Sequence, residues 1–200
     1  MALFDLVPVV LFAVCAVILM KDSYREMPKG AYALFAGGLI MSITAGVFKA
    51  LWKLLYALGI CDFAALNASF FPLQSVGFTL AACGICGALF RKKAPAVMAA
   101  AVPVYSSALI FVIFMVLGTA GIWGCLGIMA VRAGKKKAAF LISLSFVCMM
   151  AMGYLSSRDF TNPVMNWAGE GVNTCGMILL LLAVISLDHA YTEIENKLIR

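Results

Sequence analysis

Long apolar runs separated by short polar segments extend along the whole chain. Most of these runs reach the roughly 18–20 residues that a helix needs to cross the hydrocarbon core of a bilayer, and none alternates apolar and polar residues as a barrel strand does. The pattern therefore predicts an all-α, polytopic membrane protein with a seven-helix bundle over residues 1–188. The predicted spans are residues 3–20, 31–56, 70–90, 96–115, 118–131, 138–155 and 167–187.

Composition agrees with a membrane-embedded chain. Of 200 residues, 64% are hydrophobic and only 12% are charged, which is far more apolar surface than a soluble domain of this size needs. The first apolar run lacks a basic start and a small-residue cleavage pattern, and it contains Asp5 and Pro8. We therefore expect this run to be the first span and not a signal peptide.

Basic residues predict the orientation of the bundle. With seven spans, all Lys and Arg residues except Lys49, Lys53 and Arg158 lie on one side of the membrane, and basic loops stay cytoplasmic. We expect the N-terminus outside, the C-terminus inside, and the protein to be integral to a cytoplasmic (plasma or inner) membrane. The net charge of +6 then reflects contact with an anionic leaflet and indicates no nucleic-acid partner.

Residues 189–200 are predicted to form an amphipathic cytoplasmic tail that continues the last span. Tyr191, Ile194 and Leu198 share one face of this helix, and such a face rests on the inner surface of the membrane. Docking of a partner protein on this tail is the alternative.

The cysteine and histidine residues indicate no metal or cofactor. Six of the seven cysteines lie in apolar runs, where thiols pack as small apolar groups, and Cys61 has no second loop cysteine as a disulfide partner. Cys83 and Cys86 have redox-motif spacing, but no nearby group would activate a thiol, so packing is the expected role. His189 is the only histidine, which argues against zinc and haem sites.

Polar residues near the outer end of the last predicted span are the first candidates for a binding site. An ionisable residue at this depth marks either a partner across the bundle or a site, because an unpaired charge in hydrocarbon is costly. Counting along the helices at about 1.5 Å per residue places polar residues of other spans at a similar level. The ligand-binding candidates of this outer layer are Lys49, Gln74, Glu170, Asn173 and Thr174, with Asp5 entering from the first span.

Two interpretations of this outer layer are open. In the first, Lys49 and Glu170 bind opposite ends of a small polar or zwitterionic ligand in an outward-facing pocket. In the second, Lys49 and Glu170 form an interhelical ion pair that only fixes helix packing. Lys53 is expected simply to extend to the lipid headgroups.

A second set of polar residues follows Pro103 in the predicted span 96–115. A proline inside a helix frees a backbone carbonyl, and neighbouring polar groups or water then satisfy it. Tyr105 is a further ligand-binding candidate because it would line the lower part of a pathway. Packing between helices is the alternative role for Tyr105 and the two serines after it.

A weak internal repeat relates spans one to three with spans five to seven. Asp62-Phe63 and Asp159-Phe160 each precede the third helix of a half, and residues 74–78 align with residues 170–174. This pattern predicts a 3+1+3 arrangement of parallel repeats, as some transporters have. In helix count, chain length and outside N-terminus, the layout resembles that of the SWEET sugar carriers, although their motifs are not matched.

These features predict a small-molecule transporter with an outward-facing pocket inside the membrane. The alternative is a non-catalytic receptor that signals through the C-terminal helix. A third possibility is an intramembrane enzyme acting on lipids through Glu170 and Asp159, but the apolar runs contain no histidine and no nucleophile beside a base. Lysoplasmalogenase-type hydrolases are similar in size and helix count, and no motif of theirs is matched. We therefore predict no catalytic residues.

Overall fold

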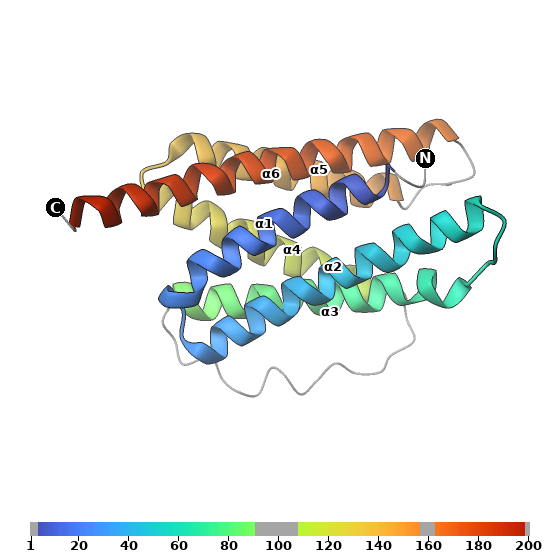
Figure 1. Ribbon diagram of the computed structural model, residues 1–200, viewed down its shortest axis with the longest axis horizontal. Helices are drawn as coiled ribbons and strands as arrows, with labels where there is room; N and C mark the ends of the chain where they lie inside the picture. The colour runs from blue at the N-terminus through green and yellow to red at the C-terminus, as the bar shows by residue number, and fades with distance from the viewer. Residues whose placement is uncertain (1–3, 91–107, 157–162, 199–200) are drawn as a thin grey trace.

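The part of the chain that the structure describes is all-α and has six helices that are long and apolar enough to cross a membrane (Figure 1). The computed structural model describes residues 4–90, 108–156 and 163–198, and within these ranges every regular element is a helix. Two helices end at a glycine with positive φ, Gly59 at 67° and Gly134 at 71°, where a side chain would be strained. The helices are α1 (Leu6–Glu26), α2 (Lys29–Ala57), α3 (Ala64–Leu89), α4 (Ala108–Arg132), α5 (Lys136–Ser156) and α6 (Pro163–Leu198).

The described helices agree with the predicted spans except in the middle of the chain. The structure has one continuous helix, α4, where a break between predicted spans 96–115 and 118–131 is expected. The predicted break is therefore wrong at residues 116–117, because Val116 and Leu117 give the helix no reason to end there. Residues 96–107, which make up the first part of that predicted span, lie outside the described residues.

Helices α3 and α4 run in the same direction. Gly118 of α4 lies against Phe78 of α3, and about two helical turns further along, the Sγ atom of Cys125 lies 3.1 Å from that of Cys86. Residue numbers therefore rise together along the two helices. It follows that α3 ends and α4 begins at opposite ends of the bundle.

Helices α1 and α6 are also parallel. The rings of Phe4 and Trp167 lie 5.6 Å apart near the start of both helices, and Asp22 hydrogen-bonds Asp188 further along. In Figure 1, α2 and α5 run opposite to the other four helices. The start of α1 and the end of α6 consequently lie at opposite ends of the molecule.

The helices pack as a closed ring in chain order. Each helix packs against its neighbours in sequence, and α6 packs against α1 to complete the ring. At one end of this ring, the turns after α1 and α4 bring basic residues together, and we call this the basic end. Its described basic residues are Lys21, Arg25, Lys29, Arg132, Lys135, Lys136 and Lys137.

The closest helix crossing joins α2 and α3, where the two backbones touch through glycines. A Cβ atom added to Gly38 would collide with the backbone of Gly77 and Ala81. At Gly84 an added Cβ would lie 2.5 Å from the backbone nitrogen of Phe35. Small residues at such positions allow the close approach that stabilises helix pairs in lipid.

A buried hydrogen-bond chain ties α4 to α5 and α6. Trp123 Nε1 donates to Ser145 Oγ at 3.0 Å, and Ser145 Oγ donates to the Gly176 carbonyl oxygen at 2.8 Å. Because Trp123 is 2% exposed and Ser145 is fully buried, water cannot replace either partner.

We expect Ser145→Ala to lower the free energy of unfolding by about 1–3 kcal/mol, because the buried Trp123 N–H loses its acceptor. Thermal unfolding in detergent measures this loss. The matched control is Ser143→Ala on the same helix, since the exposed Ser143 hydroxyl bonds only to the Ala139 carbonyl of its own turn. Equal effects of the two substitutions would contradict a stabilising role for the Trp123–Ser145–Gly176 hydrogen bonds.

Candidate functional site

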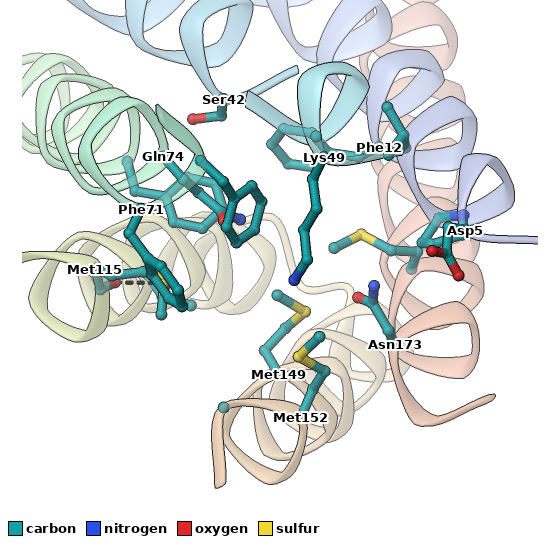
Figure 2. Close-up of a pocket in the computed structure, with 18 of the residues that line it drawn as sticks. Asp5, Phe12, Ser42, Lys49, Phe71, Gln74, Met115, Met149, Met152 and Asn173 are labelled. Carbon is teal, nitrogen blue, oxygen red and sulfur yellow. Dashed lines mark hydrogen bonds between the residues drawn. The ribbon is translucent and has the colours of Figure 1, made fainter. Parts of the chain in front are cut away.

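A cavity of about 350 Å³ lies inside the helix ring, in the half of the bundle away from the basic end. This volume is within the range of small-molecule sites. Each of the six described helices contributes side chains to its wall, which is mostly apolar with a few polar groups (Figure 2). In helix order, representative lining residues are Phe12, Ser42, Gln74, Met115, Met149 and Asn173.

Aromatic residues form the floor of the cavity. The ring of Phe78 lies 5.9 Å from that of Phe12 and 6.3 Å from that of Trp123, both in edge-to-face orientation. Beyond these rings, toward the basic end, residues such as Leu39 and Leu126 are almost completely buried in the core. The cavity is therefore closed on the side of the basic end.

Four of the predicted ligand-binding residues line this one cavity. Lys49 extends from α2, Gln74 from α3, and Glu170 and Asn173 from α6. Asp5, which was expected at the same level, also lines it.

Two other predicted site residues have different outcomes. Thr174 does not belong to the cavity wall, since one residue along a helix turns a side chain by about 100° from its neighbour. Tyr105 lies outside the described residues.

Lys53 differs most from its expected role. Instead of extending to the headgroups, its Nζ atom lies 2.5 Å from Asp5 Oδ2 and 3.2 Å from Glu170 Oε1. The three side chains are 19%, 6% and 8% exposed. Glu170 is thus paired with Lys53, and the Lys49–Glu170 ion pair of the second interpretation is not formed.

Lys49 lies deeper in the cavity than this charged cluster. Its Nζ atom lies 4.2 Å from the centre of the Phe70 ring, a cation–π contact. Among the residues that the structure describes, no ion pair reaches this ammonium group. Figure 2 shows the Lys49 side chain extending into the cavity, with its nitrogen facing Met149 and Asn173.

The spacing of the two lysines is the signal that could have predicted the charged cluster. Residues four apart share a helix face, so Lys49 and Lys53 had to point in similar directions, and one carboxylate could pair with either. Three methionines, Met149, Met150 and Met152, also line the cavity.

The arrangement offers binding groups, and no reaction is evident from it. Within the described ranges, no three His, Cys, Asp or Glu side chains converge as metal ligands would. Asp159, the proposed carboxylate partner of Glu170 in an enzyme, lies outside the described residues. Comparison with known proteins found no matching family model, no matching curated protein and no matching solved structure.

Proposed function

We propose that the protein is a small-molecule transporter that binds a small polar or amphiphilic ligand in the cavity between its helices. The observation that carries this proposal is the Lys49 ammonium group, which extends into an apolar cavity without an ion-pair partner among the described residues. A charge in such surroundings is costly unless a ligand or partner compensates it. The cavity floor of Phe12 and Phe78, with Trp123 packed behind Phe78, closes one side, as alternating access requires.

The proposed topology has seven crossings, with the N-terminus outside and the C-terminus cytoplasmic. Support comes from the direction of the described helices: α1 begins at one end of the bundle and α6 ends at the other, which an odd number of crossings would produce. The location of the basic residues between α1 and α2 and between α4 and α5 supports a cytoplasmic basic end.

The proposal includes two parallel repeats, α1–α3 and α4–α6. If α1 is exchanged with α4, α2 with α5 and α3 with α6, each closely packed helix pair becomes another closely packed pair. A two-fold axis along the membrane normal relates parallel repeats in this way. The halves would then meet at the α3–α4 and α1–α6 contacts, with the cavity between them.

Transport requires that the cavity opens to each side of the membrane in turn. We expect a membrane-impermeant thiol reagent to label Met149→Cys from both the outside and the cytoplasmic side, in a protein whose other cysteines except Cys86 and Cys125 are removed. Val147→Cys is the control on the same helix. It should not show this labelling from both sides, because Val147 is 60% exposed on the outer surface of the bundle.

Oxidation of Cys86 and Cys125 to a disulfide tests whether the closed side of the cavity must open for labelling from the cytoplasm. Their sulfur atoms lie 3.1 Å apart on the closed side of the cavity, so a disulfide between them should block labelling from the cytoplasmic side alone. Labelling of Met149→Cys only from outside, with or without the cross-link, would contradict transport.

Labelling from outside alone would favour a receptor, the second candidate function. One observation supports this candidate: α6 is a single helix that begins beside the cavity and continues through Leu198, and its end extends beyond the other helices in Figure 1. Movement of Glu170 or Asn173 on ligand binding would pass along this helix. The predicted amphipathic tail, residues 189–200, would present that movement to a partner protein.

A further inference from the structure

The cavity contains polar atoms that the described residues leave without partners. The Lys49 ammonium group has three N–H donors and lies against the Phe70 ring, while the carboxylates of Asp5 and Glu170 act on it only from beyond ion-pair distance. The Oδ1 atom of Asp5 and the Oε1 atom of Gln74 are buried and accept no hydrogen bond. Asp5 is only 6% exposed, so bulk water does not satisfy its carboxylate.

The unsatisfied donor, Lys49, and the unsatisfied carboxylate, Asp5, lie in different parts of the cavity (Figure 2). Lys49 provides a cation in its interior, as Figure 2 shows. Asp5 belongs to the cluster with Lys53 and Glu170, in which two carboxylates share one ammonium group and leave an excess of negative charge. A ligand that satisfies both parts therefore needs an anionic group for Lys49 and a donor group for Asp5.

The sum of the charges in the cavity wall favours a ligand without net charge. Asp5 and Glu170 balance Lys49 and Lys53, and these are the only charged side chains of the cavity wall in the described part of the chain. A ligand with one net charge would leave that charge uncompensated in a low-dielectric site, which is unfavourable. A ligand with one charge of each sign keeps the balance.

The rest of the wall accommodates an apolar body. Phe71, Met115, Met149 and Met177 line the cavity beside its few polar groups. A volume of about 350 Å³ is sufficient for a molecule the size of an aliphatic or aromatic amino acid. Burial of such a side chain would supply apolar binding energy in addition to the charge contacts.

We propose that the ligand is a small zwitterion with an apolar body, whose anionic group binds Lys49 and whose ammonium group binds Asp5. This inference rests on the proposed function only in that both use the same cavity. Two sources share this chemistry: a free apolar amino acid, and an aminophospholipid that enters from the bilayer.

The experiment measures binding by the purified protein in nanodiscs of phosphatidylglycerol. The probes are leucine, 4-methylpentanoate, which lacks the ammonium group, and 3-methylbutylamine, which lacks the carboxylate. We expect leucine to bind at least about tenfold more tightly than either analogue, because each analogue loses one charge-assisted contact. Equal or tighter binding of one analogue would overturn the proposal, as would the absence of binding by leucine and by the lipid described below.

Two variants test the assigned roles. In Lys49→Met, leucine should bind no more tightly than 3-methylbutylamine. In Asp5→Asn, leucine should lose its advantage over 4-methylpentanoate. Lys49→Met should still bind 3-methylbutylamine, and Asp5→Asn should still bind 4-methylpentanoate, which verifies that both variants are folded. Thr174→Val, outside the cavity wall, should keep the full preference for leucine. An unchanged preference in Lys49→Met would contradict the proposal.

The source of the zwitterion is identified by changing the nanodisc lipid. If the ligand is an aminophospholipid, phosphatidylethanolamine should be retained by the protein in native mass spectrometry and should exclude leucine. If the ligand is a free amino acid, leucine affinity should be the same in both lipids. The labelling of Met149→Cys needs no ligand, so failure of the transport proposal and failure of the zwitterion proposal are separate results.

Discussion

Replacement of Gly38 with alanine is expected to destabilise the protein by about 3 kcal/mol, at the upper end of the usual effect of overpacking. The added Cβ would collide with the backbone of Gly77 and Ala81 on α3, and backbone atoms cannot move aside as a flexible side chain can. The two helices would have to separate along their whole contact. The expected measurement is a lower midpoint of unfolding in detergent and less folded protein in the membrane.

Gly37 provides a matched control for this prediction. It precedes Gly38 in α2, but a Cβ atom added there would meet nothing within 4 Å. Gly37→Ala should therefore leave stability unchanged or raise it slightly, because alanine favours the helix over glycine by up to about 1 kcal/mol. Similar stability of the two variants would mean that α2 and α3 are not in backbone contact.

The second large effect is expected for Lys53→Met, at about 3–5 kcal/mol of lost stability. Removal of this ammonium group leaves Asp5 and Glu170 buried close together with no cation between them. A second substitution, Glu170→Gln, should restore part of the loss because it removes one of the two unpaired charges. The free energies of unfolding of the two single variants and the double variant measure this coupling.

The corresponding cycle with Lys49 serves as the comparison. Lys49 forms no ion pair with a described residue and interacts with Glu170 only at longer range, so Lys49→Met and Glu170→Gln should be coupled more weakly than Lys53→Met and Glu170→Gln. Strong coupling between Lys49 and Glu170, with none between Lys53 and Glu170, would contradict the observed pairing. It would favour the pairing that the sequence suggested.

Hydropathy was sufficient to predict the helices of the described part of the chain, because few residues other than apolar ones are tolerated in lipid. It could not predict where one span ends when no polar residue marks the end. Gly118 and Gly121 follow the predicted break directly, and the structure uses both to bring α4 close to α3. Local composition does not distinguish a helix break from a site of close packing.

The level of the site along the membrane normal could be predicted, but the lysine that pairs with Glu170 could not. A rise of about 1.5 Å per residue is enough to place Lys49, Gln74 and Glu170 in one layer. The rotation of each helix about its own axis decides which lysine meets Glu170. That rotation depends on packing with neighbouring helices, and because Lys49 and Lys53 share one face of α2, the sequence alone does not distinguish between them.

The three methionines on α5 have a consequence for selectivity. Their unbranched side chains adopt many shapes at similar energy, so this wall can adjust to ligands of different outline. Discrimination among ligands would then depend on charge rather than on size. The same wall can be oxidised: conversion of Met149 or Met152 to the sulfoxide would change an adaptable, apolar surface into a polar one.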